Sequence, residues 1–253
     1  MLWLLTWFEL SEVESVMPKN MKNQDLENLE RDLGEFDRFG FILENISSIE
    51  IKDGIREYVF TGEPKANIKV SNLSNGIKYE ITEETLADEI MFYDNGEIYA
   101  DGEKVEFSGK ESVELSIRPQ AAGIVYMNTT DCPVGVAGDY TKDVKDLSDS
   151  NIAIKKTLQS ITATGLATII GKISWQAKIA IKAAKAIKKK VDSTNENSKY
   201  LSYEAKTYYH KKAGGDGWIG GRHVTKYVTT WYTKKNFGGK SVKKTTYRLG
   251  VSG

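Results

Sequence analysis

The chain is poor in the residues that most often build metal sites and cross-linked scaffolds. Its 253 residues include one cysteine, two histidines and four prolines. A single cysteine excludes an internal disulfide framework, and one cysteine with two histidines gives no recognisable zinc-ligand spacing. The low proline content and the 13 tyrosines also argue against a disordered chain. We therefore expect a folded protein with no metal and no cofactor.

The apolar runs of the chain are short. Residues 1–10 (MLWLLTWFEL) are apolar for about eight positions. No basic residue precedes this run, and Glu9, Glu12 and Glu14 follow it without a small-residue cleavage site. It is therefore a poor export signal, and it is far short of the roughly 20 residues that span a bilayer. We expect a strand or half-helix packed on the domain, unless translation starts elsewhere.

The chain has no net charge, but its two parts are strongly and oppositely charged. Residues 1–120, the acidic half, carry 12 Lys+Arg and 26 Asp+Glu, which gives 12 − 26 = −14. Residues 121–253, the basic half, carry 23 and 9, which gives 23 − 9 = +14. This division favours a basic part that binds a polyanion and an acidic part that restrains it by intramolecular contact. Two ordinary domains of different pI are the alternative.

The acidic half has the pattern of one helix followed by a β meander. Residues 23–36 place three leucines on one helical face. After residue 47, short alternating segments are separated by Asp-Gly and Asn-Gly dipeptides, which are strong hairpin signals. The carboxylates fall mostly at outward positions, so we interpret them as a solvated surface rather than a catalytic or metal site.

After an aromatic and polar stretch, the basic half has a helical pattern at about residues 151–191. Apolar residues recur at helical spacing to Ile173, and a lysine-rich amphipathic segment follows. A cationic face opposite an apolar one is typical of an interfacial membrane helix. The predicted membrane-binding residues are Trp175, Lys178, Ile179, Lys182, Lys185, Ile187 and Lys189. A core helix with a solvated lysine face is the alternative, and nucleic acid would meet only non-specific phosphate contacts.

The last part of the chain, about residues 200–250, predicts a small antiparallel sheet rich in Tyr and Lys. Exposed aromatic residues beside lysines suit a bilayer interface, a glycan platform or single-stranded nucleic acid. The predicted fold class is therefore α+β: an acidic meander with one helix, a helical hairpin or long basic helix pair, and a small C-terminal sheet.

The domain boundary is expected near residue 120. Pro119 ends the last acidic strand, and the small residues after it form a stretch that proteases would cut. Gln120, Ala121 and Ala122 are the candidate processing junction, with an ordinary linker as the alternative.

Catalytic candidates are few. Cys132 could pair with His210 or His223 as a thiol–imidazole couple. No local signature supports a cysteine hydrolase, so we expect structural roles for these residues and no enzymatic activity.

The layout resembles the large geobacillin-type bacteriocins of bacilli and relatives. The resemblance rests on Arg118-Pro119-Gln120, on the apolar-then-basic helical stretch, and on the segment from Tyr232 to Phe237 (YTKKNF). It implies a secreted, unmodified, non-enzymatic precursor whose C-terminal part is antibacterial. The implied partner is an anionic bacterial membrane, with a surface receptor and a processing protease as further candidates and no specific nucleic acid. The alternative is a non-toxic extracellular adhesion or glycan-binding module.

Overall fold

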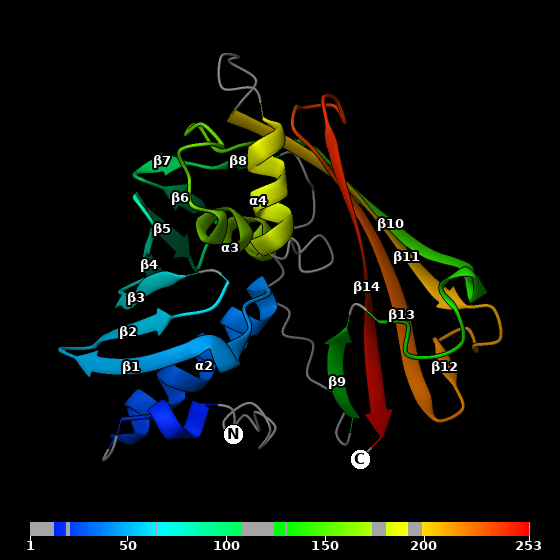
Figure 1. Ribbon diagram of the computed structural model, residues 1–253, viewed down its shortest axis with the longest axis horizontal. Coiled ribbons are helices and arrows are strands. Elements are labelled where there is room, and N and C mark those ends of the chain that lie inside the picture. Colours follow the sequence, from blue (N-terminus) through cyan, green and yellow to red (C-terminus); the bar gives the residue numbers. More distant parts are fainter. Residues whose placement is uncertain are drawn as a thin grey trace.

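Two antiparallel β-sheets face each other, and two helices occupy part of the space between them (Figure 1). The computed structural model describes residues 13–18, 21–63, 65–107, 124–129, 131–173, 181–191 and 199–252. Within these residues the fold is mostly β. Three short 3-10 turns, η1 (Glu14–Val16), η2 (Leu43–Asn45) and η3 (Ala137–Asp139), link longer elements.

The N-terminal sheet is a meander in which each strand pairs with the next one in the sequence. Its strands are β1 (Ile46–Lys52), β2 (Ile55–Phe60), β3 (Ala66–Leu73), β4 (Gly76–Glu83), β5 (Leu86–Tyr93), β6 (Ile98–Ala100) and β7 (Glu103–Lys104). Asp53 and Gly54 both have positive φ, 52° and 78°, as a two-residue type I′ hairpin turn requires. The sheet is local in sequence because each of its turns connects adjacent strands.

Helix α2 (Asn23–Phe39) covers the inner face of this sheet. Leu29, Leu33, Phe36 and Phe39 are at most 1% exposed, and they lie at the three- and four-residue steps of one helical face. The helix ends at Gly40, whose φ of 85° is the left-handed conformation that terminates many helices.

The C-terminal sheet is longer, curled, and built from segments far apart in the sequence (Figure 1). Its order is β8-β10-β11-β13-β14-β9, and β12 pairs with β13. The strands are β8 (Glu106–Phe107), β9 (Ile124–Thr129), β10 (Tyr140–Ala153), β11 (Tyr200–His210), β12 (Trp218–Ile219), β13 (Arg222–Tyr232) and β14 (Ser241–Ser252).

Helices α3 (Ala163–Ile173) and α4 (Ile181–Lys190) lie between the sheets. Helix α3 contacts β4, β5 and α2, whereas α4 contacts α3 and β14. Every residue of α3 except Lys172 is buried. Side chains of both sheets and of α2, α3 and α4 form one hydrophobic cluster, so these helices are part of the core.

The predicted fold class is wrong. Residues 151–153 end the 14-residue strand β10, and the helices are only 11 and 10 residues long. The C-terminal sheet is one of two large sheets rather than a small appendage. The cause is long-range pairing: β10 pairs with β11, which begins 47 residues after β10 ends, and local patterns carry no information about that partner.

The halves defined by charge contribute strands to the same sheet and share a core. Strand β8 of the acidic half pairs with β10 of the basic half, with Phe107 opposite Ile152. The expected boundary near residue 120 lies outside the described residues, as does the candidate junction of Gln120, Ala121 and Ala122.

Candidate functional site

The N-terminal sheet contacts the first turn of α3 through two buried carboxylates, Asp88 and Glu83. Asp88 Oδ2 accepts the backbone N–H of Thr162 at 2.7 Å, and Glu83 Oε2 accepts that of Thr164 at 3.0 Å. The first N–H groups of a helix have no partner within the helix, and its N-terminus favours negative charge. Two carboxylates of the acidic half therefore complete the start of a helix of the basic half.

Thr162 caps the same turn from within the basic half. Its Oγ1 accepts the backbone N–H of Gly165 at 2.7 Å, the usual contact of an N-cap threonine. The first turn of α3 is thus held by one local cap and two carboxylates that are 74 and 81 residues away in sequence.

Both carboxylates lie on the core-facing side of the sheet. Asp88 and Glu83 are 5% and 6% exposed, and they share the inner face with Ile81 and Ile90. A charged group on an apolar face is costly unless it is paired and hydrogen-bonded. For Asp88 the described partners are in the basic half.

The second partner of Asp88 is Lys156. Lys156 Nζ is 2.7 Å from Asp88 Oδ1 and 2.5 Å from Asp101 Oδ2, and it also donates to the Ala87 carbonyl oxygen at 3.1 Å. Burial lowers the pKa of Lys156, but the hydrogen bonds to Asp101 and Asp88 outweigh it, so this pKa is raised above its ordinary value. Asp88 therefore contacts the basic half through both carboxylate oxygens.

Among the described residues, four further ion pairs connect the two halves. They are Lys155–Glu106 at 3.3 Å, Lys172–Glu35 at 3.7 Å, Lys182–Glu63 at 3.9 Å and Lys185–Glu83 at 3.9 Å. The ammonium group of Lys172 also lies 5.3 Å from the centre of the Phe92 ring, in a cation–π contact. The exposed pairs contribute little individually, so the buried contacts of Asp88 and Glu83 matter most.

Close packing of α3 depends on its glycines. A Cβ at Gly165 would lie 2.6 Å from Asp88 Oδ2, and one at Gly171 would lie 2.7 Å from Phe39 Cδ1. Gly171 lies inside α3, where it lets the helix approach α2.

The predicted membrane-binding residues are separated by the fold. Lys182 is 81% exposed, Lys189 is exposed, and Lys185 faces Glu83. Ile187 is fully buried in the shared core. Trp175, Lys178 and Ile179 lie outside the described residues. The lysine face of α4 is thus partly available in this state, whereas its described apolar face is not.

Lys188 differs from its neighbours because it points inward. Its ammonium group donates to the carbonyl oxygen of Ile161, just before α3. Burial lowers the pKa of Lys188, and nearby carboxylates of the acidic half, Glu83 first, oppose that effect. Helix α4 therefore also supports the segment that leads into α3.

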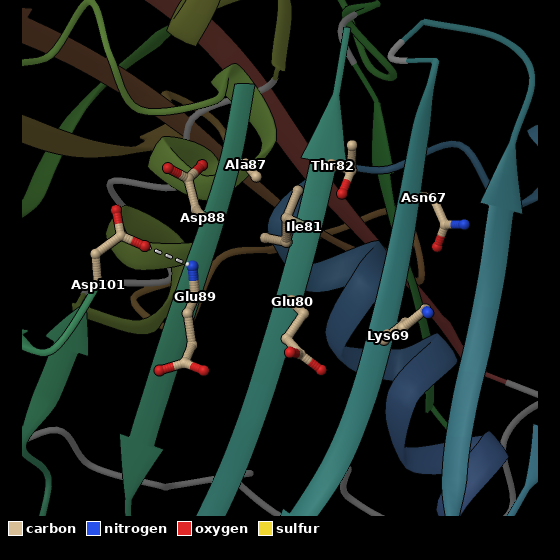
Figure 2. A pocket seen from close by; sticks show the side chains of 9 residues that line it. All are labelled: Asn67, Lys69, Glu80, Ile81, Thr82, Ala87, Asp88, Glu89 and Asp101. Atoms are coloured by element: carbon tan, nitrogen blue, oxygen red, sulfur yellow. Dashed lines mark hydrogen bonds between the residues drawn. The ribbon is translucent and has the colours of Figure 1, made fainter. Parts of the chain in front are cut away.

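A shallow groove of about 510 Å³ lies over β3, β4 and β5, and Figure 2 shows its lining. Glu80 of β4 lies opposite Glu89 of β5. The side chain of Asp101 accepts the backbone N–H of Glu89 at 2.7 Å. Lys78 is 3.3 Å from Glu80 and 3.4 Å from Glu89, so these carboxylates are already paired. The groove has the character of a solvated acidic surface.

The described contacts of Cys132 and of the two histidines do not form a thiol–imidazole pair. Cys132 Sγ donates to the Val134 carbonyl oxygen at 3.4 Å. Burial and the neighbouring Cys132 raise the pKa of Tyr247 to about 12. His210 packs edge-on against Tyr140, whereas His223 packs against Trp218 and Tyr209.

The described part of the chain shows neither a metal-binding cluster nor a membrane-spanning helix. No group of three or more His, Cys, Asp or Glu side chains there could hold a metal ion. No helix described in this structure is long and apolar enough to cross a membrane.

Comparison of the chain with protein-family models, with curated proteins and with solved structures gives no match.

Sequence reasoning missed Glu83 and Asp88 because it assigned the carboxylates to outward positions. The signal was present in the alternation. Glu83 is two residues after Ile81, and Asp88 is two residues before Ile90, so both share the parity of buried neighbours.

Proposed function

We propose that this protein is a secreted, bacteriocin-like antibacterial precursor in which the acidic half sequesters the helices of the basic half. The observation that carries the proposal is the packing of α3 on the inner face of the N-terminal sheet. Asp88 and Glu83 bind its first turn, and its apolar residues are buried against β4, β5 and α2.

In the proposed active state, α3 and α4 move away from the N-terminal sheet after the chain is cut near residue 120. Helix α4 then adds its buried residues, Ile181, Ala183 and Ile187, to an apolar surface that can enter an anionic membrane. The lysines of the opposite face add electrostatic attraction of about 1 kcal/mol each near anionic lipid. The protein acts by binding and disturbing the membrane, without an enzymatic step.

A non-toxic extracellular adhesion or glycan-binding module is the second candidate. It is favoured by the shared core, since α3 has the burial of a structural helix and β8 pairs with β10. The partly exposed Trp218 beside His223, with ring centres 5.7 Å apart, gives such a module an aromatic surface on the C-terminal sheet.

Binding at two salt concentrations distinguishes these candidates. The chain cut near residue 120 is mixed with vesicles of phosphatidylglycerol or of phosphatidylcholine, and bound protein is sedimented. The precursor proposal predicts binding to the anionic vesicles that weakens with added salt, because exposed charges are screened. Salt-insensitive binding to immobilised glycans, without vesicle binding, would instead support the adhesion module.

A further inference from the structure

Asp88 has an unusual position for a buried carboxylate. It lies on the inner face of β5, between residues that pack in the core, and it is 5% exposed. Its Oδ2 binds the Thr162 N–H and its Oδ1 binds Lys156, both at 2.7 Å. These donors lie on either side of the turn that leads into α3.

The surroundings of Asp88 leave little tolerance for a shifted helix. Gly165 approaches so closely that a Cβ there would be 2.6 Å from Asp88 Oδ2. Lys156 also contacts Asp101 and the Ala87 carbonyl oxygen, so it joins the edge of the N-terminal sheet at three points. A single carboxylate thus fixes both the backbone at the start of α3 and the lysine six residues before Thr162.

Glu83 is the secondary contact of the same turn. It accepts one backbone N–H, from Thr164, and its ion-pair partner Lys185 is 3.9 Å away. Asp88 makes two short contacts with the basic half, whereas Glu83 makes one. Charge-assisted hydrogen bonds are the stronger class, and their loss leaves buried donors without partners.

We propose that Asp88 acts as a latch between the two halves. Its two contacts hold the start of α3 against the inner face of the N-terminal sheet, and their loss releases the start of α3 while the sheet stays folded. One consequence of the latch rests on the proposed function: the contacts of Asp88 must break before α3 and α4 can bind a membrane. The latch itself is a property of the intact chain and can be measured without a membrane.

Hydrogen exchange of the intact chain tests the latch. Asp88→Leu removes both contacts but keeps an apolar side chain on an apolar face. We expect the backbone amides of residues 162–166 to exchange about tenfold faster or more, with the amides of β3 unchanged. Glu89→Leu, on the outer face of the same strand, is the matched control and should leave residues 162–166 as protected as in the unaltered chain. Equal protection in Asp88→Leu would overturn the proposal.

A second variant covers the case in which Asp88→Leu does not fold. Lys156→Met keeps the carboxylate and removes its cation, so the same amides should exchange faster, by a smaller factor. If they do not, the latch proposal is wrong.

Vesicle leakage by the cut Asp88→Leu chain separates the two proposals. Faster exchange without any leakage would contradict the proposed function but keep the latch, whereas unchanged exchange contradicts the latch whatever the vesicles show.

Discussion

At the scale of single residues, Gly165 marks the closest approach of α3 to the N-terminal sheet. Gly165→Ala should destabilise the protein by about 1–3 kcal/mol, because the added methyl group meets Asp88 and Thr162 oxygens at 2.6 and 2.9 Å. Gly34→Ala is the matched control: it lies inside α2 and its Cβ would meet nothing within 4 Å. That variant should gain about 0.5–1 kcal/mol from helix propensity. Chemical denaturation measures both, and a stabilising Gly165→Ala would contradict the described packing.

The buried pair of Asp32 and Arg56 supports α2 on the N-terminal sheet. Arg56 Nε lies 2.5 Å from Asp32 Oδ2, and Tyr58 donates to the same oxygen at 2.7 Å. Arg56→Met should cost about 3–5 kcal/mol, because it removes the buried cation of a buried carboxylate and leaves only the half-exposed Arg31, 3.3 Å from Asp32 Oδ1. Lys69→Met, which removes an exposed partner 3.6 Å from Glu57, should cost at most about 1 kcal/mol. Similar losses in thermal unfolding of the two variants would show that Asp32 is not buried as described.

The contacts of Glu83 and Asp88 could be predicted from the sequence only in part. The alternation around Ile81 and Ile90 places Glu83 and Asp88 inward, but nothing local says what a buried carboxylate would bind. Their partners are backbone N–H groups 74 and 81 residues away, which have no signature in the side-chain pattern. The lysine face of α4 was visible because it depends on helical spacing alone.

At the scale of elements, local signals and long-range pairing had different outcomes. Turns such as Asp53-Gly54 lie between paired strands, and the leucines at 26, 29 and 33 fall within α2. The helical pattern predicts a helix from about residue 151, but pairing of Ile152 with Leu201 and Phe107 makes residues 151–153 strand. The apolar segment before the lysines forms the buried 11-residue helix α3, as its helical spacing predicts.

Helix α4 carries the prediction that belongs to this scale. In the cut chain, Lys182→Gln with Lys189→Gln should weaken partition onto anionic vesicles about 30-fold, since each lysine contributes about 1 kcal/mol. Both side chains are exposed, so the melting temperature should change little. Lys65→Gln with Lys69→Gln removes the same charge from the acidic half and should leave partition unchanged. Equal weakening by both pairs would mean that net charge, rather than α4, drives binding.

At the scale of the whole molecule, the opposite charges of the halves meet across a shared core. Strand β8 pairs with β10, and buried residues of both halves form one cluster. A cut near residue 120 should therefore leave the two fragments associated, and they should elute together in size-exclusion chromatography without denaturant. Separate elution immediately after the cut would show that the shared core does not hold the halves together.

Dye release from vesicles tests whether cleavage near residue 120 makes this protein membrane-active. In the protein used for the test, a site-specific protease sequence replaces Gln120, Ala121 and Ala122. Release is recorded for the intact and the cut protein on anionic and zwitterionic vesicles. A masked membrane-active precursor predicts leakage by the cut protein on anionic vesicles, little leakage by the intact protein, and none from zwitterionic vesicles. Absence of leakage by both forms on anionic vesicles would contradict the account and leave α3 and α4 as core helices of a binding module.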